Sequence, residues 1–453
     1  MRVAFRTFGC KLNQAETESV IETFTSRGHS IVSASGNPDI HIVNTCVVTS
    51  KSAQKVRGWI RRVSRLDTQS LVLAAGCYAQ VDGHQLAELC PNVLVVPQSH
   101  KAVLHDLAEY LKRTGPILAK ESLEKKKQRV ENHLRQLAEH PAAPFSFDVR
   151  RYSLHSRAFV KIQDGCGYHC AYCIVPRARG PSVSLETGEV LERVRRLEEQ
   201  GYREVVLTGV NIASYEHDGA ELASLLPSML EATSRLRIRL SSLEPDRIDR
   251  RLRDAVADKR ICPHFHIPVQ SGSDRILKAM RRQYDARRVL DGIQMLREVR
   301  PEAHVAGDFM VGFPGETESD HHRTEEVVRT GGFARLHVFP FSPREGTAAQ
   351  KMKRRVPERI KKARAERLRE ISSKQLQAYI ASWSGRAVAA VIEGDIGSDG
   401  TAAGLSENYL KLVIRGIPRG EGRDAEDVRA GSLVECRISG PEDPCTAEFL
   451  RSL

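Results

Sequence analysis

The chain has 453 residues, enough for about three domains of roughly 150 residues each, which excludes a single small binding module. Apolar residues make up 41% of it and the mean hydropathy is -0.37, a mixture that excludes disorder throughout. The 69 Lys and Arg against 57 Asp and Glu give a formal charge of +12, which favours RNA or DNA as a partner without establishing one. No apolar run approaches the roughly 20 residues of a membrane span, and the N-terminus MRVAFRTFGC lacks a secretory pattern. We therefore expect a soluble, cytoplasmic protein with no membrane partner.

The first 118 residues alternate short apolar runs with helical stretches. Strands are predicted at MRVAFRTFG, DIHIVNTC and SLVLAAGC, and helices at NQAETESVIETF and SAQKVRGWIRRV. This pattern predicts a small N-terminal α/β domain with a mainly parallel sheet. The three strands finish at Cys10, Cys46 and Cys77. Because the carboxyl ends of parallel strands lie along one edge of a sheet, three thiolates can converge there.

The middle of the chain predicts a linker followed by a second α/β domain. Residues 119–151 run from KESLEKKKQRVENHLRQLAEH into PAAPFSFDVRR, a composition typical of a charged linker. From 152 to 382, strands alternate with helices such as TGEVLERVRRLEEQ and RRVLDGIQMLREV. Six strands are predicted, at Ala158–Ile162, Glu204–Thr208, Arg237–Ser241, His264–Val269, Val305–Val311 and Leu336–Phe341. This spacing favours a partial βα barrel whose chemistry lies on the loops after the strand carboxyl ends.

The C-terminal region changes character again. A basic helix, ERIKKARAERLREISSKQLQAYI, closes the second domain, and residues 383–453 show the short strands VAAVIEGD, YLKLVIRG and GSLVECRIS between Gly-rich turns. These strands predict a small β barrel of a kind that often binds RNA. Lys411, Arg415 and Arg419 lie near one of them, so we expect this region to contribute to RNA affinity.

The strongest chemical signal is the loop Cys166-Gly-Tyr-His-Cys170-Ala-Tyr-Cys173. Three thiolates spaced CxxxCxxC after a strand can hold three irons of a 4Fe-4S cluster and leave the fourth iron open to a substrate or cofactor. A structural zinc site usually has four ligands in paired spacing, and a ferredoxin run has CxxC steps with a fourth Cys, so neither fits. A chance cluster of buried cysteines is the remaining alternative.

The segment KIQDGCGYHCAYCIVPRARG resembles the cluster loop of radical S-adenosylmethionine (SAM) enzymes, and more narrowly that of the methylthiotransferases. The resemblance extends over nearly the whole chain. FGCKLNQAETE, VNTCVVT and AAGCYAQ resemble the three cysteine segments of the family's N-terminal domain, and the C-terminal strands resemble its TRAM domain. TGVNIASYEHDG, SSLEPDRI, HIPVQSGSD, DFMVGFPGE and HVFPFSPREGT are most similar to the branch that acts on threonylcarbamoyladenosine in tRNA.

The resemblance implies a tRNA methylthiotransferase with two 4Fe-4S clusters, which adds a methylthio group at C2 of threonylcarbamoyladenosine next to the anticodon. The cluster on Cys166, Cys170 and Cys173 would bind SAM and cleave it to a 5'-deoxyadenosyl radical. A second cluster on Cys10, Cys46 and Cys77 would carry the sulfur. The C2 hydrogen is on an unactivated carbon, which explains why cofactors perform this chemistry. The implied partners are the tRNA anticodon stem-loop, an electron donor of flavodoxin or ferredoxin type, and a sulfur donor.

Polar residues at the ends of three predicted barrel strands are candidates for lining the SAM site. They are Thr208, Gly209, Ser242, Glu244, Gln270 and Ser271. For Thr208 and Gly209 an ordinary turn is an equal alternative. We reject the trio Cys262, His264 and His266 as a metal site, because two of them alternate into a barrel core and no fourth ligand is nearby in sequence.

Two groups of alternatives stay open. Related enzymes modify isopentenyladenosine in tRNA or an aspartate of a ribosomal protein, and the sequence does not display the pocket that separates these substrates. A protein of another class, a non-enzymatic RNA-binding protein with an iron-sulfur cluster, is disfavoured by the cysteine spacing together with the TRAM-like tail.

Overall fold

The computed structural model describes residues 1–137, 143–153, 155–418 and 428–453. The chain divides into two compact units. The N-terminal unit comprises Met1–Leu154, Lys161–His169 and Cys173–Val183, and the barrel unit comprises His155–Val160, Cys170–Tyr172 and Ser184–Leu453. Within the described ranges, no helix combines the length and apolar character needed to cross a membrane. Each unit is described by itself below.

The N-terminal unit is built on a parallel five-stranded sheet with the order β2-β1-β3-β4-β5. The strands are β1 (Arg2–Thr7), β2 (Ser30–Ile31), β3 (Ile40–Thr45), β4 (Leu71–Gly76) and β5 (Val93–Pro97). The structure therefore confirms the predicted parallel sheet and the three predicted strands, which are β1, β3 and β4. Strands β2 and β5 are additional to the prediction. All residues of β3 and β4 are buried, because helices cover both faces of the sheet.

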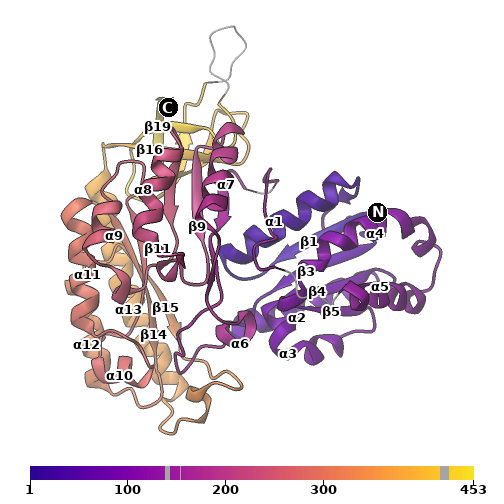
Figure 1. Ribbon diagram of the computed structural model, residues 1–453. Helices are drawn as coiled ribbons and strands as arrows, with labels where there is room; N and C mark the ends of the chain where they lie inside the picture. Colours follow the sequence, from indigo (N-terminus) through magenta and orange to yellow (C-terminus); the bar gives the residue numbers. More distant parts are fainter. Residues whose placement is uncertain (138–142, 154, 419–427) are drawn as a thin grey trace. The chain divides into compact units, whose positions relative to one another are not determined.

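Five longer helices cover this sheet (Figure 1). They are α1 (Lys11–Ser26), α2 (Ser50–Leu66), α3 (Cys77–Ala87), α4 (Val103–Leu118) and α5 (Leu123–Leu137), with a short turn η1 (Gln98–His100) before α4. The apolar residues of α1, α4 and α5 share one hydrophobic core with the sheet, and those of α2 and α3 share another. The helices thus form a layer on each face.

The charged stretch expected to be a linker contains a packed helix. Helix α5 lies within residues 119–151, and its Val130 and Leu134 are buried in the core that α1 and α4 share. These two residues are four positions apart, so they form a narrow buried stripe on a helix that is mostly charged and polar. Composition alone hides such a stripe. The predicted boundaries at 118 and 151 stay a prediction.

All six strands predicted for the partial barrel are present, each within one residue of the expected bounds. They are β6 (Ala158–Lys161), β9 (Glu204–Thr208), β12 (Arg237–Leu240), β13 (His264–Gln270), β14 (His304–Val311) and β15 (Arg335–Pro340). They pair in parallel as two sheets, β12-β9-β6 and β13-β14-β15. Isolated parallel bridges from Ile238 to Ile261 and from Ser242 to His266 connect β12 with the chain of β13. The carboxyl ends of these strands therefore share one side, as the expectation requires.

Helices connect these strands, and shorter strands occur in the loops (Figure 1). The helices are α6 (Val175–Arg179), α7 (Thr187–Glu199), α8 (Leu222–Ala232), α9 (Arg250–Ala255), α10 (Asp274–Ala279), α11 (Ala286–Val299), α12 (Glu318–Thr330) and α13 (Glu358–Trp383), with the turns η2 (Ile212–Ser214), η3 (Pro245–Arg247) and η4 (Ala348–Lys351). The short strands are β7 (Gln163–Asp164), β8 (Val183–Ser184), β10 (Glu216–His217) and β11 (Ala220–Glu221).

The C-terminal region forms a closed barrel with the strand order β16-β17-β18-β20-β19, which confirms the predicted small β barrel. Its strands are β16 (Ala387–Glu393), β17 (Ala402–Ser406), β18 (Lys411–Arg415), β19 (Leu433–Ile438) and β20 (Cys445–Ser452). Cys436 and Cys445 are buried in its core, as small hydrophobic residues. Arg419 lies outside the described residues.

Buried ion pairs connect the C-terminal barrel to the amino ends of the partial barrel strands. Glu204 pairs with Arg157, Arg237 and Arg239, whose nearest nitrogens lie 3.4, 2.7 and 2.7 Å from its carboxylate. Arg239 has no exposed side-chain surface and also donates to the carbonyl oxygens of Ser406 and Glu407, at 3.0 and 2.9 Å. Although burial raises the pKa of Glu204, the three guanidinium groups outweigh it and hold the pKa well below its usual range.

We expect Glu204→Gln to lower the free energy of unfolding of the barrel unit by about 3–5 kcal/mol, because it leaves buried arginines without their carboxylate. Urea titration followed by Trp383 fluorescence in a Trp59→Phe background measures this unit, since the chain has only these two tryptophans. The control Glu435→Gln removes an exposed pair with Arg451 and should cost less than about 1 kcal/mol.

The destabilisation by Glu204→Gln should also depend on pH. A carboxylate whose folded-state pKa is depressed contributes stability above its unfolded-state pKa, near 4.5, and loses that contribution as pH falls further. The difference between wild type and variant should therefore be full at pH 7 and shrink below about pH 4.5. A difference that is constant from pH 7 to pH 3 would contradict the assignment of the pairs to Glu204.

Candidate functional site

Three cysteines of the N-terminal unit lie at the carboxyl edge of its sheet, as the sequence predicts. Cys10 precedes α1 directly after β1, Cys46 follows β3, and Cys77 begins α3 after β4. The strands β1, β3 and β4 are neighbours in the sheet. Gly9 adopts a φ of +109°, and a side chain on it would place its Cβ 2.8 Å from the Cβ and 3.1 Å from the Sγ of Cys46. The turn before Cys10 therefore packs directly on the Cys46 thiol, and only glycine fits there.

The Cys46 thiol interacts electrostatically with the other two cysteines and with Arg179. Burial raises its pKa to about 11, and the thiols of Cys10 and Cys77 raise it as well, whereas Arg179 lowers it. Without a bound cation, the Cys46 thiol is protonated at neutral pH. A metal that binds thiolates must therefore displace its proton.

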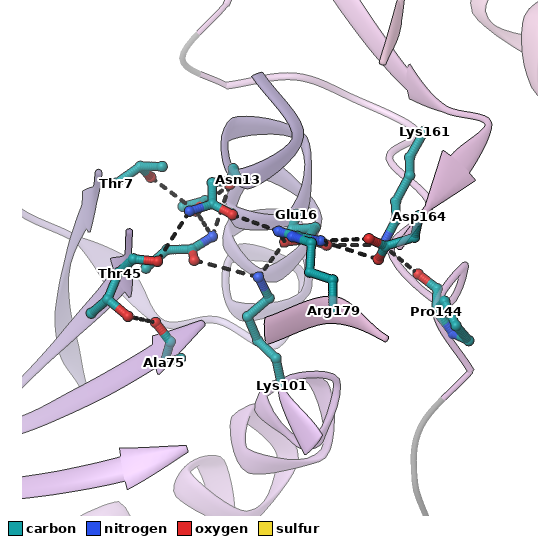
Figure 2. Close-up of polar contacts among 12 residues, drawn as sticks. Thr7, Asn13, Glu16, Thr45, Ala75, Lys101, Pro144, Lys161, Asp164 and Arg179 are labelled. Atoms are coloured by element: carbon teal, nitrogen blue, oxygen red, sulfur yellow. Dashed lines mark hydrogen bonds and ion pairs between the residues drawn. The ribbon is translucent and has the colours of Figure 1, made fainter. Parts of the chain in front are cut away.

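The same unit contains a buried ionic network (Figure 2). Its centre is Glu16 on α1, whose carboxylate accepts from Lys101, from Lys161 at 2.8 Å and from Arg179 at 3.0 Å. Asp164 also pairs with Lys161 at 2.6 Å and with Arg179 at 3.0 Å. All five side chains are at most 7% exposed.

This network contains three cations and two carboxylates, so it carries a surplus positive charge in the interior. Although burial raises the pKa of Glu16, the cations Arg179, Lys101 and Lys161 hold it well below its usual range. Burial lowers the pKa of Arg179, but the attraction of Asp164 and then of Cys77 outweighs this effect and raises the pKa. Arg179 lowers the pKa of Cys10 and of Cys46, against the larger raising effect of burial, so it favours the thiolate forms that bind metal.

Backbone N–H groups donate to two of the three sulfurs of the CxxxCxxC loop. The Tyr168 N–H donates to Cys166 Sγ and the Val175 N–H to Cys173 Sγ, both at 3.4 Å. Gly165, with a φ of +66°, allows the loop to start, because a Cβ on it would lie 1.8 Å from the Pro181 carbonyl oxygen. Such N–H donors stabilise negative charge on sulfur, so the loop is suited to thiolate ligands.

Arg282 of the barrel unit is a site residue that the sequence did not reveal. Its Nη1 donates to Cys170 Sγ at 3.2 Å, its Nη2 pairs with Glu244, and its Nε donates to the Tyr284 hydroxyl at 2.8 Å. Burial raises the pKa of Glu244 to about 7, against the lowering effect of Arg282. Nothing in the letters RRQY separates this arginine from the many other basic residues of the chain.

The residues predicted to line a SAM site occupy the expected strand ends. Thr208 is buried at the end of β9, with Gly209 next, and Gln270 ends β13 with a φ of +67°. The Ser242 hydroxyl lies 2.7 Å from His266 Nδ1. Ser271 has a different environment, because it is fully buried and its hydroxyl accepts the Ser273 N–H at 3.2 Å. Their contact with SAM stays a prediction.

Cys262, His264 and His266 have three separate environments, so the structure gives no reason to join them in one metal site. Burial raises the pKa of the Cys262 thiol to about 11. The His264 ring stacks on Tyr409 with centroids 3.9 Å apart, and His266 Nε2 lies 2.9 Å from Asp308 Oδ1.

Two family models match this chain. The radical SAM superfamily model matches residues 160–328, and a model described as uncharacterized protein family UPF0004 matches residues 2–97. Among similar proteins, the threonylcarbamoyladenosine tRNA methylthiotransferase MtaB of Treponema pallidum is 37% identical, over 96% of this chain and 98% of that one. The MtaB protein of Aquifex aeolicus is 35% identical, over 92% and 97%. The tRNA-2-methylthio-N(6)-dimethylallyladenosine synthase of Syntrophotalea carbinolica is 34% identical, over 86% and 87%.

Among solved structures, the radical SAM methyltransferase TsrM from Kitasatospora setae, with cobalamin and a 4Fe-4S cluster bound, has a TM-score of 0.54. The likeness covers 77% of this chain and 74% of that one at 14% identity. At this identity the likeness supports the fold, with its partial barrel and additional α/β domain.

We expect Glu16→Gln to destabilise the N-terminal unit by about 3–5 kcal/mol, because it would leave Lys101 without a carboxylate and Lys161 and Arg179 with Asp164 alone. Urea titration followed by Trp59 fluorescence in a Trp383→Phe background measures this change on the metal-free chain. The control Glu109→Gln removes an exposed pair with Arg27 and should cost less than about 1 kcal/mol. Equal effects of the two substitutions would show that the Glu16 network is not essential to the unit.

Proposed function

The chain belongs to the family of radical SAM tRNA methylthiotransferases, and we propose that it adds a methylthio group at C2 of threonylcarbamoyladenosine next to the anticodon. The observation that carries this proposal is the near full-length similarity to relatives of that name, including those of Bacillus subtilis and Thermotoga maritima, each 32% identical. As a radical SAM protein, the chain uses SAM and a 4Fe-4S cluster.

Cys166, Cys170 and Cys173 would hold the cluster that, when bound, supplies the electron for reductive cleavage of SAM. Their sulfurs accept hydrogen bonds from N–H groups of Tyr168, Val175 and Arg282. These hydrogen bonds offset the negative charge of the thiolates. Arg282 is itself positioned by Glu244 and by Tyr284. The chain therefore prepares the loop for anionic sulfur before any metal is bound. Thr208, Gly209, Ser242, Glu244 and Gln270 would line the space for SAM.

Cys10, Cys46 and Cys77 would hold a second 4Fe-4S cluster, which supplies the sulfur that becomes the methylthio group. Two observations support this proposal. The three residues follow adjacent strands with the Cys46 thiol packed on the Gly9 turn, and the surplus positive charge of the Glu16 network lies beside them. This positive charge would stabilise the thiolates after their protons leave.

The substrate and the partners follow from the same reasoning. The net charge of +12 and the closed C-terminal barrel support tRNA binding, and the anticodon stem-loop is the part that carries the modified base. A flavodoxin or ferredoxin as electron donor, a sulfur donor, and a cytoplasmic location remain predictions.

The test of this function is the product formed by the anaerobically reconstituted wild-type protein. With SAM, dithionite and a stem-loop containing threonylcarbamoyladenosine, we expect mass spectrometry to detect the methylthiolated nucleoside. Product only from isopentenyladenosine, or only on a ribosomal protein aspartate, would assign the chain to those related activities. Absence of both product and 5'-deoxyadenosine would support a non-enzymatic iron-sulfur protein.

Cysteine substitutions separate the two clusters. The wild type should hold about eight irons, the number expected for two 4Fe-4S clusters. The Cys166, Cys170 and Cys173 triple alanine variant should lose about half of them and all SAM cleavage. Cys46→Ala should also lose iron and abolish methylthiolation, but it should still release 5'-deoxyadenosine. Methylthiolated product from Cys46→Ala would contradict the second cluster.

The C-terminal barrel should contribute to tRNA affinity through its exposed cations. Deleting it would leave Arg239 without its carbonyl partners, so charge reversal is the sharper test. Lys411→Glu with Arg415→Glu should weaken binding and reduce the slope of log affinity against log salt by roughly 0.7–0.9 per lost phosphate contact. The control pair Arg250→Glu and Lys259→Glu makes the same charge change outside this barrel. Equal slopes for both pairs would assign tRNA binding elsewhere.

A further inference from the structure

A polar cluster of the barrel unit has no role in the mechanism described so far. It consists of His266, Asp308 and His337, each of which offers a nitrogen or carboxylate oxygen within 4.8 Å of the others. They come from three neighbouring parallel strands, β13, β14 and β15, and Asp308 and His337 are direct partners in the strand register. His266 Nδ1 also lies 2.7 Å from the Ser242 hydroxyl, so a fourth strand segment supports the cluster.

The cluster faces the side of the sheet opposite to helix α13. Leu336 and Val338 are buried, so this face of β15 is covered, and at the edge of the sheet the Leu336 N–H donates to the Ser372 hydroxyl of α13 at 2.9 Å. His337 alternates with these residues and is exposed, as is Phe339, two positions further along the strand. The face that carries the cluster is therefore open to an incoming group.

The same face is closed one layer below the cluster. His264 precedes His266 by two positions on β13, and its buried ring stacks on Tyr409 of the C-terminal barrel. Arg239, also buried, lies 5.3 Å from the centroid of the Tyr409 ring. In the other direction, Gln270 ends β13 roughly 13 Å beyond His266, at about 3.3 Å per residue. The cluster is thus a polar layer above a closed floor, below the strand ends.

The hydrogen bonding within the cluster does not require a metal. If the Ser242 hydroxyl donates to His266 Nδ1, the His266 Nε2–H donates to Asp308 at 2.9 Å, and both ring nitrogens then have a hydrogen-bond partner. His266 and Asp308 retain 19% and 23% of their side-chain exposure, so their polar atoms are still partly hydrated. A group that enters this space must replace that water with hydrogen bonds or leave polar atoms unsatisfied.

We propose that His266, Asp308 and His337, with Ser242 positioning His266, receive the N6 substituent of the substrate adenosine and select a polar substituent over an apolar one. This inference rests on the proposed function. A threonylcarbamoyl group carries ureido N–H donors, a hydroxyl and oxygen acceptors, which can pair with the carboxylate and the imidazoles. An isopentenyl group carries none of these and would leave the cluster unpaired, which disfavours it by about 10- to 100-fold.

The test compares two stem-loops that differ only in the N6 substituent, threonylcarbamoyl or isopentenyl. The ratio of their kcat/KM values for methylthiolation is measured for wild type, His337→Phe, His337→Asn and the control His322→Phe, an exposed histidine of α12. His337→Phe should lower kcat/KM for the threonylcarbamoyl substrate at least about 10-fold and leave the isopentenyl substrate unimpaired. His337→Asn, which keeps a donor and an acceptor, should recover part of the loss. SAM cleavage without tRNA and the melting temperature should be unchanged.

Each other outcome overturns a defined statement. If wild type does not act on the threonylcarbamoyl substrate, the proposed function fails. If wild type acts on it but His337→Phe impairs both substrates equally, or neither, the function stands and the selecting role of the cluster is wrong. Metal analysis of the reconstituted proteins covers the remaining alternative. Loss of one equivalent of a divalent metal other than iron in His337→Phe would make the cluster a metal site and overturn the proposal.

Discussion

The N-terminal unit depends on a single buried carboxylate, Glu16, that binds three cations. Burial of any one of these charges alone would be strongly unfavourable, and their mutual pairing is what makes the arrangement possible. Because Glu16 lies on α1 while Arg179 lies 163 positions away on α6, the network joins distant parts of the sequence within one unit. It does so beside Cys10, Cys46 and Cys77. The charge balance that stabilises this unit is therefore the same balance that favours thiolates at its sheet edge.

The barrel unit also has one buried carboxylate, Glu204, that binds several basic side chains. Glu204 also binds three cations, two of them buried, but here the guanidinium groups of the buried Arg237 and Arg239 also reach backbone carbonyls of the C-terminal barrel. In both units one buried carboxylate binds basic side chains from segments that are distant in the sequence. One network prepares a binding edge, and the other closes the floor of the partial barrel and connects it to the C-terminal barrel.

The sequence allows the strands and the cysteines to be predicted because both signals are local. Each of the six barrel strands is a short segment in which large apolar residues recur. The CxxxCxxC spacing is contained in eight residues. The sequence does not reveal Glu16, Glu204 or Arg282 as central residues, because their partners lie far away and each looks like any other charged side chain. The segment of helix α5 is typical of a linker by composition, because it is mostly charged and polar and only Val130 and Leu134 are buried. The grouping of His266 with Asp308 and His337 likewise depends on strand register, which a single sequence does not display.

Tyr409 of the C-terminal barrel stacks on His264, and Arg239 binds the carbonyl oxygens of Ser406 and Glu407. These contacts have a consequence for evolution and for engineering. A β barrel that is attached in this way cannot be replaced by the barrel of another protein without losing these contacts. A chimera that receives the C-terminal barrel of another protein would need an aromatic ring and two carbonyl groups at matching positions, or a smaller apolar residue in place of Arg239. Drift in one partner is therefore constrained by the other, and the two barrels of this unit should change together in the course of divergence.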